Sequence, residues 1–153
     1  MIAANENIEH NPNSRAPILY GVAAFISLIG LADALYLTIE HVTGQSVRCT
    51  VISGCSEVLS SPYAVVAGIP LALLGALAYF VVFSLATLAA FHYQWAGKLL
   101  SLIVGLMLLI TLWLLYLQAF IIHHFCQFCL LSAAVTITLT AVAVFARFRR
   151  GVP

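Results

Sequence analysis

Apolar side chains fill four long runs of this chain, and short polar segments separate them. The runs cover about residues 18–39, 68–91, 99–122 and 125–146. Each run is close to the ~20 apolar residues that a helix needs to cross a bilayer. The first run is too long for the core of a cleavable signal peptide. The pattern therefore predicts an all-α membrane protein, a bundle of four transmembrane helices.

Polar segments at both ends and after the first run complete the expected layout. Residues 1–17 form a polar tail, residues 18–146 form one membrane domain, and residues 147–153 form a basic tail. The longest connection, residues 41–62, is rich in glycine and serine, so we expect a loop with at most a short helix. The second helix is expected to begin close to Pro70, since proline is tolerated in a first turn.

Composition supports a membrane protein and excludes several other classes. Hydrophobic residues make up 63% of the chain, charged residues only 7%, and the mean hydropathy is +1.10. Such a chain has too little polar surface for a soluble globule, so the lipid bilayer is its expected surroundings. No basic run is long enough to predict binding to nucleic acid.

Lysine and arginine predict the orientation, because these residues are retained on the cytoplasmic face. With a cytoplasmic N-terminus, the inner side holds Arg15, Lys98, Arg147, Arg149 and Arg150. Only Arg48 then lies outside, in the 41–62 loop. We therefore expect both termini in the cytoplasm, and an outer, periplasmic loop between the first two helices.

The four cysteines fall in two pairs that this orientation places on the same, oxidising side. Cys126 and Cys129 form a C-x-x-C motif in the first turn of the fourth helix, where unpaired N–H groups and the helix dipole favour thiolate. Cys49 and Cys55 lie in a loop with Gly54 between them, which is free to move as thiol–disulfide exchange requires. The pattern predicts a two-step thiol relay.

Two other classes of protein remain as alternatives at this point. His123, His124, Cys126 and Cys129 have the ligand types of a zinc or copper site, although adjacent histidines do not easily face one site and the loop pair would have no role. In the third possibility the loop pair is a structural staple and the protein is a non-catalytic membrane subunit.

Three segments of the chain form a distinctive ordered combination: Gly54-Cys55-Ser56-Glu57-Val58-Leu59-Ser60-Ser61-Pro62-Tyr63, then Gly68-Ile69-Pro70-Leu71-Ala72-Leu73-Leu74-Gly75, then Phe125-Cys126-Gln127-Phe128-Cys129. Together they resemble the vitamin K epoxide reductase family, in particular its bacterial homologues without a fused thioredoxin domain. The resemblance covers roughly residues 18–146. It implies a four-helix bundle around a quinone, and loop cysteines that exchange with a thioredoxin-fold partner.

The resemblance also implies a direction of electron flow. A separate, extracytoplasmic thioredoxin-fold protein would be oxidised by the loop pair, with Cys49 meeting the partner and Cys55 reaching Cys126. Cys129 would face a membrane quinone such as ubiquinone or menaquinone. The expected function is that of a thiol:quinone oxidoreductase that drives disulfide formation from a bacterial plasma membrane.

Several residues are candidates for the quinone pocket. The aromatic candidates are Tyr79, Trp113, Phe125 and Phe128, and the hydroxyl candidates are Ser61 and Ser132. Asp33, the only acid within a span, is a functional candidate because burial of a charge in a membrane is costly. Vertebrate members carry a tyrosine where this chain has Ala133, which weighs against epoxide reduction and leaves quinone reduction open.

Overall fold

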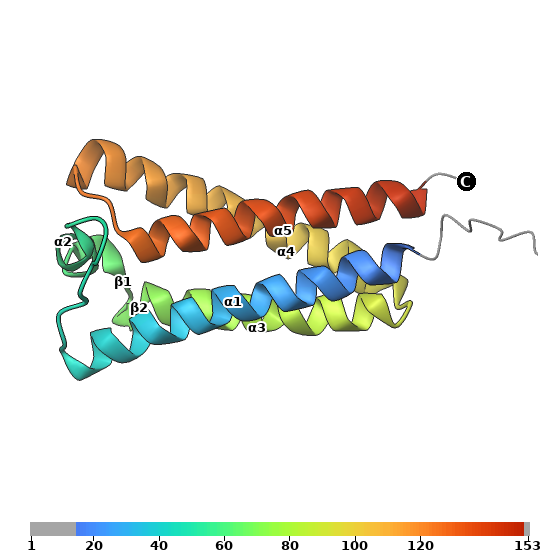
Figure 1. Cartoon of the computed structure of the whole chain (residues 1–153), viewed down its shortest axis with the longest axis horizontal. Helices are drawn as coiled ribbons and strands as arrows, with labels where there is room; N and C mark the ends of the chain where they lie inside the picture. Colours follow the sequence, from blue (N-terminus) through green and yellow to red (C-terminus); the bar gives the residue numbers. More distant parts are fainter. Residues whose placement is uncertain (1–14, 152–153) are drawn as a thin grey trace, which may run out of the picture.

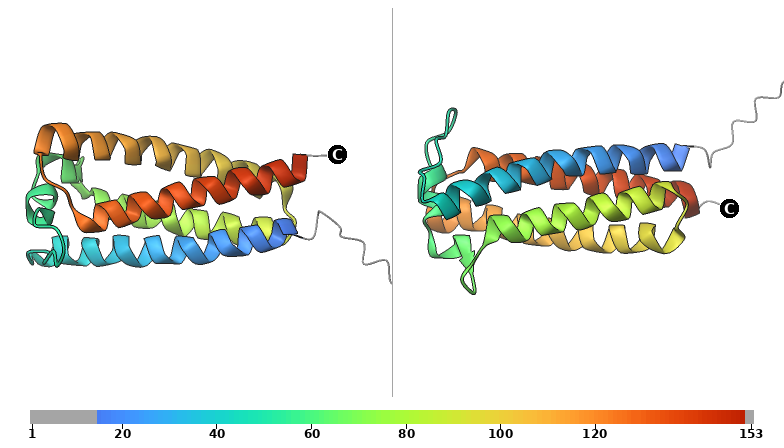
Figure 2. Two further views of the ribbon diagram at one scale, coloured as in Figure 1. Left: turned by 45° about the horizontal axis from the view of Figure 1, so that its top comes forward. Right: turned by 90° about the horizontal axis from the view of Figure 1, so that it is seen from below.

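Four long helices run side by side along the molecule in the computed structural model (Figure 1, Figure 2). The structure describes residues 15–151, so most of the expected polar tail and the last two residues lie outside it. The helices are α1 (Ala16–Thr43), α3 (Leu71–Ala90), α4 (Gln94–Leu117) and α5 (Gln127–Gly151). All four are long and apolar enough to cross a membrane. The expected fold class, an all-α membrane bundle, is confirmed, and the protein is a multi-pass membrane protein.

The helices form a closed ring in which α1 packs against α3 and α5, and α4 packs against the same two helices. Their shared core contains many small side chains, as is common where membrane helices approach closely. These include Ala23, Ala34, Ala76, Ala86, Ala89, Ala96 and Ala143. Gly30 of α1 makes room for Tyr79 of α3, because an added Cβ at this position would overlap the ring.

Large apolar side chains cover the outside of the bundle, as expected for a surface in contact with lipid. Phe25 on α1 is 67% exposed, and Leu102 on α4 is 68% exposed. The buried polar side chains among the described residues are few. They are Ser27, Asp33, Thr38, Gln118 and Thr136.

The first helix is longer than the expected 18–39 at both ends. It begins at Ala16, with Pro17 in its first turn, where the missing N–H of proline costs nothing. It continues through the polar residues that follow the apolar run and ends at Gly44, which adopts a left-handed conformation (φ 67°). The amide of Gly44 donates to the carbonyl of His41, so the glycine cap rather than the loss of hydrophobicity ends the helix.

The connection between α1 and α3 reaches residue 70 rather than the expected 62. It contains the short helix α2 (Cys55–Leu59), a 3-10 turn (Pro62–Ala64) and a hairpin of β1 (Val65–Val66) and β2 (Ile69–Pro70). Ala67 and Gly68 both have positive φ at the hairpin turn, which is the geometry of a two-residue hairpin loop. Because this hairpin includes Pro70, α3 begins at Leu71, next to Pro70 as the proline predicted and three residues after the start of the apolar run at 68.

The last two helices also differ from the expected 99–122 and 125–146. α4 starts earlier, at Gln94, and its end becomes a π-helical segment, Gln118–Ile122. His123 then turns the chain with a left-handed conformation (φ 56°), so α5 starts at Gln127. At the other end α5 continues through Arg147 and Arg149, because basic residues are favourable in a last helical turn.

Candidate functional site

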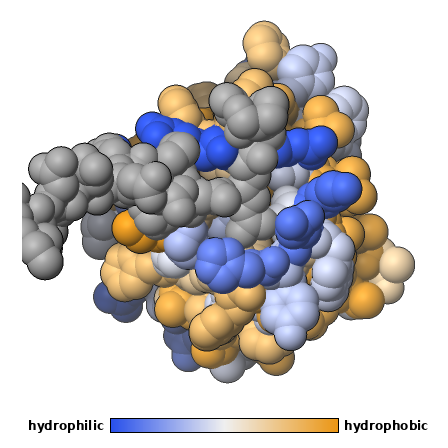
Figure 3. Space-filling view, turned by 90° about the vertical axis from the view of Figure 1, so that its right-hand side faces the viewer, coloured by the Kyte–Doolittle hydropathy of each residue, from blue (hydrophilic) through white to orange (hydrophobic). Residues whose placement is uncertain are grey.

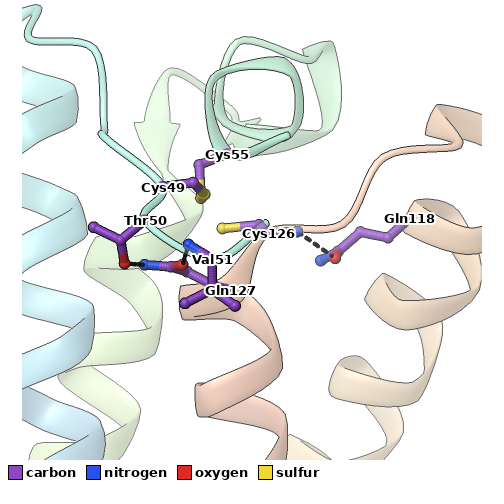
Figure 4. The surroundings of a disulfide bond; sticks show 7 residues. All are labelled: Cys49, Thr50, Val51, Cys55, Gln118, Cys126 and Gln127. Atoms are coloured by element: carbon purple, nitrogen blue, oxygen red, sulfur yellow. Dashed lines mark hydrogen bonds between the residues drawn. A yellow bond between two sulfur atoms is a disulfide. The ribbon is translucent and has the colours of Figure 1, made fainter. Parts of the chain in front are cut away.

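All four cysteines lie at the end of the bundle that carries α2 and the hairpin (Figure 1), and Figure 4 shows Cys49, Cys55 and Cys126. Cys49 and Cys55 are joined by a disulfide, with their Cα atoms 5.9 Å apart. Cys55 opens α2 and is 1% exposed, whereas Cys49 lies in the preceding irregular segment and is half-buried. One sulfur of the loop disulfide is therefore enclosed by protein, and the other is closer to the surface.

Cys126 and Cys129 are free thiols in the structure. The expectation that both lie within the first helical turn is wrong for Cys126, which immediately precedes α5. Its carbonyl accepts the first hydrogen bond of the helix, from the Leu130 amide at 3.0 Å. Cys126 therefore occupies the N-cap position, where a side-chain atom can accept hydrogen bonds from the free amides of the first turn.

The environment of Cys126 lowers the pKa of its thiol to about 7. The largest cause is a hydrogen bond from the Cys129 thiol, and backbone amides of Cys129 and Phe128 add to it, against the opposing effect of burial. These amides belong to the first turn of α5, so the helix N-terminus supplies the donors that the thiolate needs. At neutral pH a large fraction of Cys126 is therefore a thiolate.

Gln127 ties the disulfide loop to the start of α5 (Figure 4). Its side-chain oxygen accepts a hydrogen bond from the Val51 amide at 3.0 Å, and its side-chain nitrogen donates to Thr50 Oγ1 at 3.5 Å. On the other side, the Cys126 amide donates to Gln118 Oε1 at 3.3 Å. These bonds hold the loop, the C-x-x-C segment and the end of the π-helical segment together.

Gly54 brings the loop backbone against the segment that precedes α5. A Cβ added at Gly54 would lie 2.7 Å from the Phe125 carbonyl oxygen and 3.3 Å from the Cβ of His124. Only glycine permits so close an approach of two backbones. Because Gly54 directly precedes Cys55, this contact sets the position of the loop disulfide relative to Cys126.

The two cysteine pairs meet in one buried apolar cluster. Cys55 and Cys126, which is 0% exposed, belong to its core, and Cys49 and Cys129 pack against it. In Figure 4 the sulfur of Cys126 points toward the Cys49–Cys55 disulfide. The structure thus brings together all four cysteines that the sequence singled out.

A cavity of about 260 Å³ lies between the helices, next to this cluster. Cys129 is part of its wall, so the C-x-x-C motif has Cys126 toward the loop and Cys129 toward the cavity. Most of the lining is aliphatic, from all four long helices and from α2. Its polar members include Asp33, Ser61, Tyr79, Gln118 and Ser132.

Tyr79 anchors one wall of the cavity by joining α3 to α5. Its hydroxyl contacts Ser132 Oγ at 2.7 Å and Thr136 Oγ1 at 3.0 Å, and it donates to the Ser132 carbonyl at 3.0 Å. The ring is 1% exposed. Three of the residues proposed from the sequence, Ser61, Tyr79 and Ser132, therefore lie at the cavity.

The other three aromatic candidates do not line it. Trp113 is 59% exposed on α4 and stacks on Tyr116. Phe125 is 41% exposed, and Phe128 packs on Tyr36 of α1 with ring centroids 5.2 Å apart. The lining of the cavity therefore does not include them, because an aromatic residue on an apolar helix can equally face lipid or a neighbouring helix. A role for these three residues in binding a quinone stays a prediction.

The alternative of a metal site has no support among residues 15–151, where no three potential ligands come together. His123 and His124 are both exposed at the turn before α5. Two residues that position the cysteines, Gln118 and Gln127, were missed in the sequence. Gly54 was expected to leave the loop free to move, but it instead packs closely against the segment that precedes α5. The sequence did offer a signal for each glutamine. Gln118 is an isolated polar side chain near the end of an apolar run, and Gln127 lies inside the C-x-x-C motif.

Fold and site together define a four-helix membrane protein with a loop disulfide placed beside a C-x-x-C dithiol. The family model described as "Vitamin K epoxide reductase family" matches residues 22–144, and the chain belongs to this family. It is also similar to "Thiol-disulfide oxidoreductase LTO1" of Arabidopsis thaliana, with 45% identity over 56 residues. That stretch is 36% of this chain and 15% of the relative. Both matches support an oxidoreductase, as expected from the sequence.

Proposed function

We propose that the protein is a thiol:quinone oxidoreductase that oxidises an external dithiol and passes its electrons to a membrane quinone. The observation that carries the proposal is the buried contact region shared by the loop disulfide and Cys126. Family membership and the similarity to a thiol-disulfide oxidoreductase support the same chemistry. Disulfide formation in a thioredoxin-fold partner would be the net result.

The proposed first exchange takes place at the loop. A thiolate of the partner attacks Cys49, which is half-buried and thus the more accessible sulfur, and Cys55 leaves. The partner's second thiol then displaces Cys49, so that the partner gains a disulfide and the loop pair becomes a dithiol. Two electrons and two protons have moved from the partner to the loop.

The proposed second exchange moves the electrons inward. Cys55 attacks Cys126 of a Cys126–Cys129 disulfide and releases Cys129, and Cys49 then attacks Cys55 and releases Cys126. The lowered pKa of Cys126 favours its departure, because a thiol of low pKa leaves faster. The loop disulfide is restored and the inner pair is reduced, which is the arrangement seen in the structure.

The cavity suits the ring of a quinone, which would supply the final two-electron acceptor. Its volume of about 260 Å³ is slightly below the ~300–1,000 Å³ of small-molecule sites, which suits a head group whose tail extends into lipid. Its walls are mainly aliphatic, and one buried polar atom in them, Asp33 Oδ2, has no hydrogen-bond partner in the described chain. Cys129 is positioned to face the ring.

The distribution of basic residues supports an orientation with both termini in the cytoplasm. Arg15, Lys98, Arg147 and Arg149 belong to the end of the bundle where α1 begins and α5 ends, and hydrophilic side chains gather there (Figure 3). Arg48 lies at the opposite end with the cysteines. By the positive-inside rule, the cysteines would face the outer side of a bacterial plasma membrane.

Trapping the inner exchange tests the proposal. In a Cys129→Ser variant, the Cys126 thiolate has no resolving partner and should attack the loop disulfide, giving a Cys55–Cys126 bond and a free Cys49. Peptide mapping after alkylation identifies both. The matched control is the Cys126→Ser variant, which should keep the loop disulfide intact. An intact loop disulfide in both variants would contradict the proposed relay.

The quinone step has its own test. Purified protein in nanodiscs, first fully reduced, is mixed with ubiquinone-1 or with a short-chain menaquinone. Oxidation of Cys126 and Cys129, read by gel shift with a thiol-reactive polymer, supports the proposal. If neither quinone oxidises the pair although diamide does, a quinone is not the electron acceptor.

A further inference from the structure

Asp33 is a buried acid without a partner on the wall of the same cavity as Cys129. It lies on α1, within the membrane-spanning part of the bundle, and is 8% exposed. Its Oδ2 atom is the one buried side-chain oxygen or nitrogen in the described chain that lacks a hydrogen-bond partner. Burying such a group without a hydrogen bond is costly, so its persistence here indicates a role in the cavity.

No positive charge in the cavity compensates Asp33. The other titratable side chains that line it are His41 from α1, Tyr63 from the 3-10 turn, Tyr79 from α3 and Cys129 from α5, and the lining residues of α4 include none. His41 is eight residues further along α1, which corresponds to ~12 Å of helix. The hydroxyl of Tyr79 is engaged with Ser132 and Thr136. In these surroundings burial favours the neutral acid.

The electron transfer of the proposed function needs one proton more than the cysteines supply. Above about pH 7 the reduced pair is mainly a Cys126 thiolate and a Cys129 thiol, because the pKa of Cys126 is about 7. Oxidation of this pair to a disulfide releases two electrons and one proton. Reduction of a quinone to a quinol consumes two electrons and two protons, so a second acid must contribute.

We propose that Asp33 is this second acid: its neutral carboxyl gives one proton to the reduced quinone oxygen, and the resulting carboxylate is reprotonated from the aqueous side. This inference rests on the proposed function. The proton of the Cys129 thiol and the proton of Asp33 together balance the reaction, and no further reductant or oxidant is needed. A role as proton donor also accounts for a buried acid in the span that has no counter-ion.

An infrared measurement on the protein without quinone tests the protonation state. The reduced protein in lipid, titrated from about pH 5 to about pH 8, should show a carboxylic acid C=O band that persists above the pKa of Cys126 of about 7 and that the Asp33→Asn variant lacks. The matched control is Glu40→Gln, on the same helix but outside the cavity lining, which should keep the band. If the band is missing from the wild type, Asp33 is ionised and the proposal is wrong.

A single-turnover experiment tests the proton transfer. Reduced protein is mixed with ubiquinone-1 at about pH 8, and the oxidation of Cys126 and Cys129 is followed. A proton donor contributes ~10²–10⁴-fold to a rate, so Asp33→Asn should slow this step by at least ~100-fold. Asp33→Glu should recover part of the rate, and Glu40→Gln should match the wild type.

The outcomes separate this inference from the proposed function. If the wild type reacts and Asp33→Asn reacts equally fast, Asp33 is not the donor, while the relay stands. If the wild type itself is not oxidised by the quinone, the proposed function fails and this inference fails with it. The trapped Cys55–Cys126 bond should form in an Asp33→Asn, Cys129→Ser double variant, which confirms that the variant is folded around its cysteines.

Discussion

Replacing Gly54 with alanine should separate the two cysteine pairs without removing any reactive group. The added Cβ would lie 2.7 Å from the Phe125 carbonyl oxygen, closer than a carbon and an oxygen normally approach. The Phe125 backbone has little freedom to yield, because the next amide, that of Cys126, is bonded to Gln118. The loop must therefore lift, and Cys55 moves away from Cys126.

The magnitude follows from the cost of inserting one methyl group into a filled space, which is ~1–3 kcal/mol. If this cost falls on the docked loop, each ~1.4 kcal/mol lowers the docked population about tenfold. The effective concentration of Cys55 at Cys126 should therefore decrease by ~5- to 150-fold. The reduced entropy of the unfolded chain, worth ~0.4–1 kcal/mol, affects global stability and not this local equilibrium.

Effective concentration is measured directly by redox equilibrium with glutathione. In a Cys49→Ser, Cys129→Ser background, only Cys55 and Cys126 remain, and the ratio of bonded to free thiols gives the value with and without Gly54→Ala. Gly105→Ala on α4, where a Cβ meets nothing within 4 Å, is the matched control and should have no effect. An unchanged value in Gly54→Ala would refute the claim that this contact positions the loop.

Three further results are expected from the same geometry. Gln127→Leu removes both bonds to the loop, worth ~0.5–1.5 kcal/mol each, and should speed alkylation of the loop cysteines after mild reduction. In a Cys49→Ser, Cys55→Ser background, where the loop cannot trap Cys126, the lowered pKa of Cys126 means that its alkylation rate rises with pH through about 7. Adding Cys129→Ala to this background removes the largest cause of the shift, so the midpoint should move up toward ordinary thiol values. Tyr79→Phe should lower the free energy of unfolding by ~1 kcal/mol, measured by SDS titration, whereas Tyr116→Phe, 50% exposed, should not.

The four spans were predictable because a lipid bilayer permits few backbone conformations. Backbone groups in a bilayer must be satisfied within the segment, so a long apolar run must be a helix. The ends were less predictable, since they depend on local backbone geometry. Gly44 and His123 end their helices in left-handed conformations. The hairpin with Ala67 and Gly68 at its turn includes residues 68–70, which the apolar run predicted to be helical.

The four cysteines were identifiable because their chemistry is tied to residue type and spacing. The cavity wall was not, because each span is apolar on all sides and periodicity then gives no inward face. Trp113 and Tyr79 look alike in sequence, yet one is 59% exposed and the other 1%. The contacts of Gln127 with the loop join residues about 76 positions apart, and no local pattern records such a pair.

In the proposed relay, the position of Cys126 at the N-cap would let electrons pass inward with little movement of the helices. Its sulfur faces the loop disulfide (Figure 4), while Cys129, three residues later and ~4.5 Å further along the axis, faces the cavity. One helical turn thus separates the site of thiol exchange from the site of the proposed quinone. The hydrogen bond between the two cysteines lowers the pKa of the outer one, so the reduced pair holds its single remaining proton on Cys129. That proton is therefore on the cavity side, where the proposed reaction consumes it.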